Sequence, residues 1–372
     1  MAELILITGG AGFIGRNVGE ELLRRGYRVR VLDALLDQVH GETSGADALD
    51  SGIDFQQGDV RDAGAVKAAL RDVGAVVHLA AEVGVGQSMY EVVRYCDTND
   101  LGTATLFEQL IETPVRRVVT ASSMSIYGEG LYRTVDGEPV ETAVREPQRG
   151  EVRDWNPRDH EGRPLLPVAT PEWKRPALQS VYALNKYAQE RLTHILAQSY
   201  GMESVCLRLF NVFGPGQALS NPYTGVLAIF AARLLNGQPP MIFEDGEQRR
   251  DFVHVRDVAR AFADALERPG VSGETLNIGS GQDRSVREIA QQLAHAMGRG
   301  DLAPEITGKA RIGDIRHCFA DTRAAKDMLG FEAREDFAAR LTELAQWVEA
   351  QQRAEDRVEH ARGELERRGL VA

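Results

Sequence analysis

Two side chains with acid–base chemistry, Tyr182 and Lys186, stand four residues apart in the segment 180–190, whose pattern is that of a helix. Residues at this spacing share one helical face. Far upstream, the segment 117–128 has the pattern of a strand that delivers the hydroxyl of Ser123 to its C-terminal edge. A free tyrosine, with a pKa of about 10, is a poor base at neutral pH, but a neighbouring ammonium group favours the phenolate. We therefore expect Tyr182 to take a proton from a substrate hydroxyl that Ser123 also contacts.

A Tyr and a Lys at this spacing also occur by accident, so the interpretation depends on a glycine-rich turn near the start of the chain. An apolar run at 4–8 leads into Gly9-Gly-Ala-Gly-Phe-Ile-Gly15, an amphipathic helix follows, and a second strand ends at Asp33. Gly9 permits the tight turn, Gly12 lets backbone amides approach a pyrophosphate at the helix N-terminus, and Gly15 lets the helix pack on the sheet. This order predicts a dinucleotide site.

The acid at the end of the second strand indicates which dinucleotide is bound. Asp33 can accept hydrogen bonds from a ribose 2′-hydroxyl, and its charge would repel a 2′-phosphate. NAD is therefore favoured over NADP, and nearby Arg30 is the residue that would argue for NADP. With NAD bound, the carbinol carbon would give up hydride while Tyr182 removes the hydroxyl proton.

The strands and helices that must position these groups continue to alternate along the chain. A strand at 53–55 precedes Asp59 and Val60, which we expect beside the adenine, and a strand at 75–79 precedes the small residues Ala80 and Ala81. Ordinary packing at strand ends explains each of these taken alone. Their order predicts an α/β fold with a doubly wound parallel sheet of the Rossmann type.

Composition excludes several other classes of protein. The 372 residues include 43 Lys and Arg against 55 Asp and Glu, a net charge of −12 that disfavours binding to nucleic acid or anionic membranes. The three cysteines form no close pair, so we predict neither a disulfide framework nor a metal site. No apolar run approaches the ~20 residues of a membrane span, and no basic leader precedes the first strand, so we expect a cytoplasmic protein.

Further motifs follow in an order that resembles the extended short-chain dehydrogenase/reductases, and among them the NAD-dependent nucleotide-sugar epimerases and dehydratases. The matching segments are 98–102, 208–216, 250–257 and 277–280, and the resemblance covers about 3–331. We expect an NAD-binding domain of residues 1–213 plus about 253–278, with an insert at 128–181, and a smaller C-terminal substrate domain of 214–252 and 279–350. The pattern of 336–368 predicts one long charged helix. We assign its C-terminal part, 351–372, to neither domain and expect it to be a charged C-terminal helix.

The resemblance implies roles residue by residue. Catalysis is assigned to Ser123, Tyr182 and Lys186. The implied cofactor contacts are Gly9, Gly12, Phe13, Ile14, Gly15, Asp33, Asp59, Val60, Leu79, Ala80, Ala81, Asn99, Tyr182 and Lys186. The substrate, a nucleotide-diphosphate sugar, is implied to contact Ser123, Ser125, Asn211, Arg250 and Arg311. From the residues alone, ion pairs of the two arginines with Asp251 or Asp314 are equally good explanations.

The residues after Ser123 bear on the reaction. Relatives that dehydrate or decarboxylate sugars resemble one another in carrying a carboxylate at one of the next two positions, whereas this chain has Met124 and Ser125. Reversible oxidation at C4, and hence 4-epimerisation, remains. The long insert is most similar to that of dTDP-L-rhamnose 4-epimerases, and its prolines and tryptophans favour an ordered lid.

Alternatives remain open at this point. They are a 4-epimerase acting on UDP-glucose or UDP-glucuronate, a decarboxylase or 4-keto reductase on the same scaffold, and, from a different class, a non-catalytic NAD-sensing protein. Sensors commonly lose the Tyr and Lys pair, which this chain keeps. Resemblance also implies a homodimer formed by the helices after Asn99 and around Tyr182.

Overall fold

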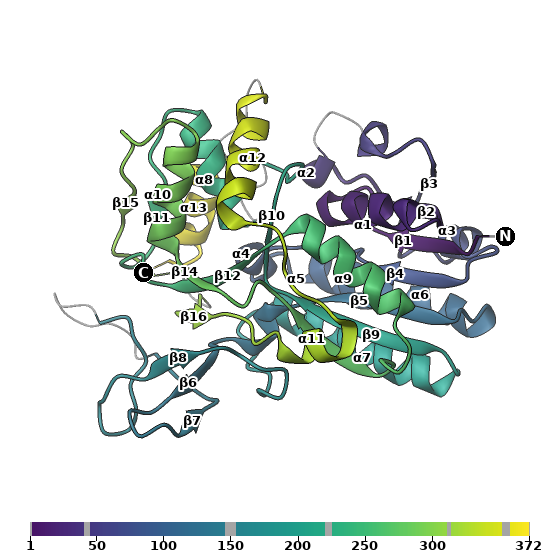
Figure 1. Ribbon diagram of the computed structural model, residues 1–372, viewed down its shortest axis with the longest axis horizontal. Helices are drawn as coiled ribbons and strands as arrows, with labels where there is room; N and C mark the ends of the chain where they lie inside the picture. The colour runs from purple at the N-terminus through teal and green to yellow at the C-terminus, as the bar shows by residue number, and fades with distance from the viewer. Residues whose placement is uncertain are drawn as a thin grey trace.

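A seven-stranded parallel sheet forms the centre of the molecule in the computed structural model, which describes residues 2–40, 45–145, 154–219, 225–310, 314–351 and 358–371 (Figure 1). Its strands, in spatial order, are β3 (Ile53–Gln57), β2 (Arg28–Asp33), β1 (Leu4–Thr8), β4 (Ala75–His78), β5 (Arg117–Ser123), β9 (Glu203–Leu209) and β13 (Glu274–Ile278). The order reverses direction between β1 and β4, and ligands of such sheets bind in the crevice at this point. The doubly wound parallel fold predicted from the sequence is confirmed.

Helices cover both faces of this sheet. Residues alternate between the faces along a strand, so Ile5 and Ile7 of β1 face one layer while Leu4 and Leu6 face the other. The first layer contains α1 (Phe13–Arg24), α9 (Val255–Glu267) and α11 (Arg323–Leu329). The second contains α3 (Ala63–Ala69), α6 (Gly102–Glu112) and α7 (Val181–Ser199). The chain thus returns to the large domain at α9 and β13.

A smaller domain is built on an apolar cluster of its own, separate from the two layers of the central sheet. Three helices, α8 (Val226–Leu235), α10 (Val286–Ala296) and α12 (Phe337–Glu349), pack together there. Its strands are β10 (Asn211–Phe213), β12 (Arg249–His254), β14 (Asp283–Ser285) and β16 (His317–Cys318) in one sheet, with β11 (Met241–Ile242) paired to β15 (Glu305–Ile306). A capping box between Ser285 and Glu288 begins α10.

The insert folds as a separate three-stranded antiparallel sheet at the lower left of Figure 1. Its strands are β6 (Leu131–Arg133), β7 (Pro139–Val140) and β8 (Leu166–Val168). Thr170 in the insert forms a bridge with Ala320, so the insert lies against the segment that follows β16.

The prediction of one long C-terminal helix is wrong. Helix α12 ends at Glu349, and a separate helix, α13, spans Val358–Arg367. The expected pair of Glu364 with Arg368 is present at the end of α13, whereas the partner expected for Glu349, Arg353, lies outside the described residues.

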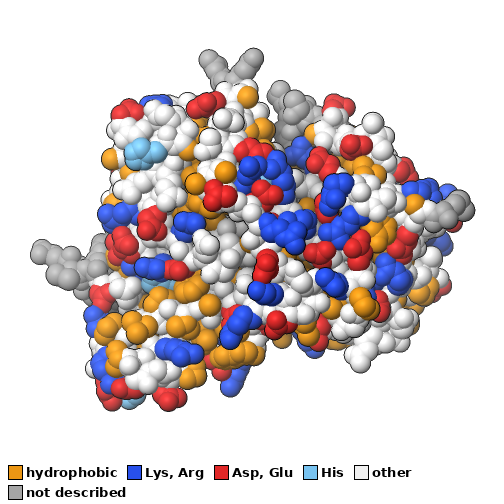
Figure 2. Space-filling model, viewed as in Figure 1, with side chains coloured by type: hydrophobic (Ala, Val, Ile, Leu, Met, Phe, Trp, Pro, Cys, Tyr) orange, Lys and Arg blue, Asp and Glu red, His pale blue; other side chains and the backbone are white. Residues whose placement is uncertain are grey.

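Basic and acidic side chains are interspersed on the face of the molecule drawn in Figure 2. Across the part of the chain that the structure describes, no helix has both the length and the apolar character that crossing a membrane requires.

Candidate active site

A cavity of about 920 Å³ lies at the C-terminal ends of the central strands, between the two domains. Single ligand pockets have volumes of roughly 300–1,000 Å³, so this one is near the upper end of that range. The predicted site residues that line it are Gly9, Gly12, Phe13, Ile14, Gly15, Asp33, Asp59, Val60, Leu79, Ala80, Ala81, Ser123, Ser125, Tyr182, Lys186, Asn211 and Arg250. The structure therefore brings seventeen positions from both domains to one space.

The glycine-rich turn fits a dinucleotide. Gly9 has φ of +69°, and a Cβ atom added to it would lie 2.7 Å from the backbone nitrogen of Ala80. A Cβ at Gly15 would lie 2.5 Å from the Cα of Gly10, so only glycine permits this packing. Helix α1 begins directly after Gly12, and the first amides of a helix point to an anion at its N-terminus.

Asp33 lies in the wall of the cavity, with its carboxylate held by the turn. Its Oδ2 accepts a hydrogen bond from the backbone of Ala11 at 3.0 Å, and its Oδ1 accepts one from Leu35 at 2.9 Å. A carboxylate has about four acceptor positions, so capacity for a ribose hydroxyl remains. Arg30 instead donates to Asp54 at 2.7 Å and to two backbone carbonyls, and it does not line the cavity. The residue that argued for NADP is therefore engaged elsewhere.

Asn99 lies behind the cavity wall rather than in it, which departs from its implied role as a direct cofactor contact. Its side chain is fully buried and forms hydrogen bonds with both backbone groups of Glu82. Oδ1 accepts from the Glu82 amide at 2.7 Å, and Nδ2 donates to the Glu82 carbonyl at 3.1 Å. Glu82 does line the cavity and pairs with Arg94 at 2.8 Å. Sequence reasoning missed both Glu82 and Arg94, although Glu82 directly follows Ala81 in the segment after β4.

The reactive side chains come from β5 and the first turns of α7. Ser180 caps the N-terminus of α7 by accepting a hydrogen bond from the Ala183 amide. Because Tyr182 and Lys186 are four residues apart in this helix, their side chains lie on the same face. Lys186 Nζ donates to the Ala121 carbonyl of β5 at 3.1 Å. The Tyr182 amide donates to Ser88 Oγ at 3.1 Å, so the short helix α4 (Val85–Ser88) abuts the start of α7.

Burial disfavours the charged form of both reactive groups. It raises the pKa of Tyr182 to about 12, which a hydrogen bond with the Ser123 hydroxyl partly offsets. It also lowers the pKa of Lys186 to about 8. The phenolate expected from the sequence therefore needs a further positive charge in the site, and an oxidised nicotinamide ring carries one.

A buried ion pair holds α7 on the sheet below these groups. Glu190, one turn after Lys186, accepts from Arg208 of β9 at 2.7 Å and from the Ser122 hydroxyl of β5 at 2.8 Å. Both charged side chains are at most 7% exposed. The pair fixes α7 against both strands, and with it the place of Tyr182.

Arg250 and Asn211 enter the cavity from the substrate domain. Arg250 donates to the carbonyls of Arg316 at 2.8 Å and Ile315 at 2.6 Å, and its Nη2 lies 3.5 Å from Asp314. Asn211 donates to the Asp251 carbonyl at 2.9 Å. The guanidinium is therefore held mainly by neutral acceptors and keeps its charge for an anion in the cavity. The other predicted phosphate ligand, Arg311, lies outside the described residues.

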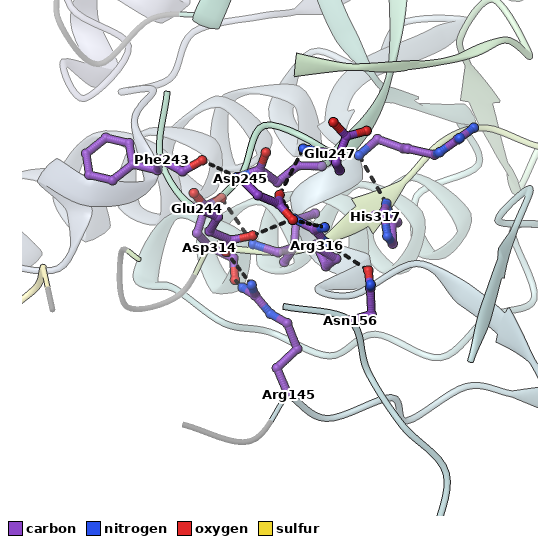
Figure 3. A network of polar contacts seen from close by, with 12 residues as sticks. Arg145, Asn156, Phe243, Glu244, Asp245, Glu247, Asp314, Arg316 and His317 are labelled. Carbon is purple, nitrogen blue, oxygen red and sulfur yellow. Dashed lines mark hydrogen bonds and ion pairs between the residues drawn. The ribbon is translucent and has the colours of Figure 1, made fainter. Parts of the chain in front are cut away.

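Figure 3 shows the network around Arg316, whose backbone carbonyl accepts the hydrogen bond from Arg250. Arg316 donates to Glu244 at 3.0 Å, to Asp245 at 2.6 and 2.9 Å, and to Asn156 of the insert at 3.1 Å. Glu129, also from the insert, accepts from the Arg316 amide at 2.8 Å and pairs with Arg145 at 2.9 Å. The insert thus contacts the backbone that holds Arg250.

The prediction that the insert covers the site as a lid is wrong for its described residues. Only Gln179 and Ser180, at its very end, line the cavity. Part of the cavity wall is instead formed by Leu365 and Leu370 near the C-terminus, which sequence reasoning missed.

Comparison with known proteins agrees with this geometry. The model of the NAD dependent epimerase/dehydratase family matches residues 5–149 and 163–279. The chain is 35% identical over 348 residues to the dTDP-L-rhamnose 4-epimerase of Burkholderia thailandensis, across 92% of this chain and 94% of that protein. It is 28% identical to the UDP-N-acetyl-alpha-D-glucosaminuronate decarboxylase of Bacillus cytotoxicus, across 93% of this chain and 98% of the relative.

A solved structure shows the same fold with the cofactor. The UDP-glucose 4-epimerase of Thermus thermophilus, in complex with NAD, superposes with a TM-score of 0.73 at 31% identity, across 94% of this chain and 99% of that one. The family match covers most of the chain and includes the glycine-rich turn, Asp33 and the Tyr182–Lys186 pair. This chain therefore belongs to the NAD dependent epimerase/dehydratase family and is a nucleotide-sugar epimerase-type enzyme that uses NAD.

Proposed function

We propose that the enzyme is a nucleotide-sugar 4-epimerase whose substrate is a dTDP-6-deoxyhexose such as dTDP-L-rhamnose. The observation that carries the proposed reaction is the composition of the reactive end of the cavity, and the similarity to the dTDP-L-rhamnose 4-epimerase of Burkholderia thailandensis supports the proposed substrate. Ser123, Tyr182 and Lys186 meet there, and the two residues after Ser123 that line the same wall are Met124 and Ser125. These groups suffice for reversible oxidation of a hydroxyl-bearing carbon and provide no carboxylate for a second reaction.

The residues divide the proton chemistry among them. Bound NAD supplies the reversible two-electron acceptor for C4 of the sugar. Tyr182 takes the proton of the C4 hydroxyl through its phenolic oxygen and returns it after the ketone has turned in the cavity. Ser123 holds the same oxygen, and Lys186 keeps positive charge beside the phenolate and contacts the cofactor ribose. Asn211 and Arg250 hold the diphosphate while the sugar turns.

Carboxylates elsewhere in the cavity already have donors. Among the residues that the structure describes, four line it: Asp33 accepts backbone amides, Asp59 pairs with Arg61, Glu82 with Arg94, and Asp314 lies beside Arg250. None belongs to the segment that follows Ser123. This distribution favours epimerisation over dehydration or decarboxylation.

The other candidate functions are distinguishable by product. A decarboxylase releases carbon dioxide from a nucleotide uronate, and a 4-keto reductase consumes NADH in proportion to its product. A protein that only senses NAD would turn over none of these substrates. The 4-epimerases of UDP-glucose or UDP-glucuronate differ from the proposal in substrate only.

A panel of nucleotide sugars tests the proposal. The purified enzyme with NAD is incubated with dTDP-L-rhamnose, UDP-glucose, UDP-galactose and UDP-glucuronate, and products are identified by proton NMR. We expect the C4 epimer of dTDP-L-rhamnose to accumulate to equilibrium, with slower conversion of the other sugars. Conversion of a UDP-sugar alone would assign a different substrate, and carbon dioxide release from UDP-glucuronate would assign a different reaction.

The assembly supported best is a homodimer formed through α7 and the helices beside it. Val93 of α5 (Val92–Tyr95), Leu101 of the adjoining π-helical segment Cys96–Leu101, and Leu184 and Ile195 of α7 are each at least half exposed. An apolar surface of this kind is typical of an interface. Light scattering should give twice the mass of the chain, and Leu184→Glu should give the mass of one chain.

A further inference from the structure

The C-terminal segment of the chain, expected from the sequence as a charged helix, lies against the substrate side of the cavity. Leu365 of α13 is 7% exposed and lines the same cavity as Ser123 and Tyr182, as does Leu370 beyond the helix end. Figure 1 shows α13 in the region of β11, and Glu366 pairs with Lys309 just after the partner strand β15 at 3.1 Å. The helix therefore lies on the wall of the smaller domain.

A helix-ending motif brings the two leucines together. The Leu370 amide donates to the Leu365 carbonyl at 2.9 Å, and the Gly369 amide donates to the Glu366 carbonyl at 3.0 Å. Gly369 has φ of +69°, which a glycine adopts without strain. This pair of bonds is the Schellman motif, in which the residues at the positions of Leu365 and Leu370 commonly make an apolar contact.

Contacts on the cofactor side hold the same segment across the cavity. Leu365 packs on Gly86 of α4, where an added Cβ would lie 3.4 Å from its Cδ2. The guanidinium of Arg368 lies 4.3 Å from the ring centre of Tyr90, two residues after α4. The segment thus contacts both domains, one through Lys309 and the other through α4 and Tyr90. Exposed ion pairs contribute little, so the two leucines carry most of this docking.

The position of α4 indicates which part of a substrate the leucines face. Ser88, two residues beyond Gly86, accepts the hydrogen bond from the amide of Tyr182. Leu365 is therefore next to the helix that adjoins the catalytic tyrosine, at the sugar end of the cavity. A buried apolar wall accepts a methyl group, whereas a hydroxyl placed there without a partner loses its hydrogen bonds to water.

We propose that Leu365 and Leu370 are specificity-determining residues, and that they make the enzyme select sugars whose C5 substituent is a methyl group over those with a hydroxymethyl or carboxylate group. This inference rests on the proposed epimerase function and names its substrate class, the nucleotide-linked 6-deoxyhexoses. Apolar pockets reject an added hydroxyl by roughly 10- to 100-fold in kcat/KM. We expect a preference of that size.

The test compares a matched pair of sugars, dTDP-L-rhamnose and dTDP-L-mannose, which differ only in the hydroxyl at C6. For the full-length protein with NAD, kcat/KM and the calorimetric Kd are measured for both. The wild type should prefer dTDP-L-rhamnose by roughly 10-fold or more. Leu365→Asn should bring the ratio to within about threefold of unity, and cooperative thermal unfolding of the variant shows that its domains remain folded. Leu166→Asn, at a half-exposed position of β8 outside the cavity, is the matched control and should keep the wild-type ratio.

Failure of this inference differs from failure of the proposed function. If neither dTDP-sugar is a substrate, the same ratio is measured with UDP-6-deoxyglucose and UDP-glucose, which again differ only at C6. A wild-type ratio near one in the pair that the enzyme accepts overturns the inference, as does an unchanged ratio in Leu365→Asn. Absence of turnover with both pairs overturns the epimerase function, and the ratio of Kd values then decides the role of Leu365.

Discussion

Replacement of Arg316 by Met tests whether the network in Figure 3 stabilises the enzyme. The Arg316 side chain is 1% exposed and donates to Glu244, Asp245 and Asn156. Removal of one partner from a buried ion pair costs roughly 3–5 kcal/mol, because the other charge stays buried. Glu244, itself 1% exposed, would keep Arg145 as a cation, so we expect the lower part of that range.

The expected change in melting temperature follows from the size of the chain. Unfolding entropy near 60 °C is about 2.1 cal/mol/K per residue, so the 372 residues give about 0.8 kcal/mol/K if they unfold together. A loss of about 3 kcal/mol then lowers Tm by about 4 °C, measured by differential scanning calorimetry. Arg323→Met removes an exposed arginine that pairs with Asp321 and should leave Tm within about 1 °C of wild type.

A second measurement tests the link from this network to ligand binding. The Arg316 carbonyl is one of the acceptors that orient Arg250, so Arg316→Met should also weaken dTDP binding by roughly tenfold, or about 1.4 kcal/mol. Arg323→Met should not. The reasoning is refuted if Arg316→Met lowers Tm no more than the Arg323 control, or if the dTDP affinities of the two variants are equal.

Three further outcomes are expected. Asp33→Ser should weaken NAD binding roughly tenfold and narrow the preference for NAD over NADP; calorimetry giving an unchanged ratio would contradict the role of Asp33. Tyr182→Phe should keep the fold and NAD affinity but lower kcat by about 10² to 10⁴, and near-wild-type activity would mean that another group is the base. Burial lowers the pKa of His78 and His317 to about 3 and of His254 to about 4. These groups take up protons in the unfolded chain at about pH 6.5 but stay neutral in the folded protein, so the free energy of unfolding should fall by up to about 4 kcal/mol per pH unit as the pH drops from about 6.5 toward 4. Chemical denaturation at several pH values measures this dependence, and in His254→Gln its slope should be smaller by the contribution of one proton.

Local chemistry explains what could be predicted from the sequence. A strand, a turn that only glycine can make, a helix and an acid at the next strand end fit together within the first 33 residues, so Gly9 and Asp33 could be predicted as neighbours from the local sequence, and both line the cavity. The helical period places Tyr182 and Lys186 on one face in the same way. Both inferences need no knowledge of distant packing.

Long-range packing explains what could not be predicted. Asn99 was expected at the cofactor, but its amide group satisfies the buried peptide groups of Glu82, and only the folded chain shows which backbone lies opposite it. Among the described residues of the insert, Glu129 and Asn156 contact Arg316, which lies 187 and 160 positions further along the chain, so the local sequence could not show these contacts. Leu365 packs on Gly86, although most of the sequence separates the two residues. Gly369 was the one local signal for it, since a glycine after a helix with leucines on either side is typical of a Schellman motif.

Incubation of the enzyme with dTDP-L-rhamnose in deuterated water tests the central claim most directly. In the proposed mechanism, the C4 hydrogen leaves and returns as hydride, and only the hydroxyl proton passes through Tyr182 and exchanges with solvent. Proton NMR should therefore show the C4 epimer with its C4 hydrogen retained, formed without added reductant and without net NADH. Deuterium at C4 of the product, or a requirement for stoichiometric NADH, would contradict this mechanism.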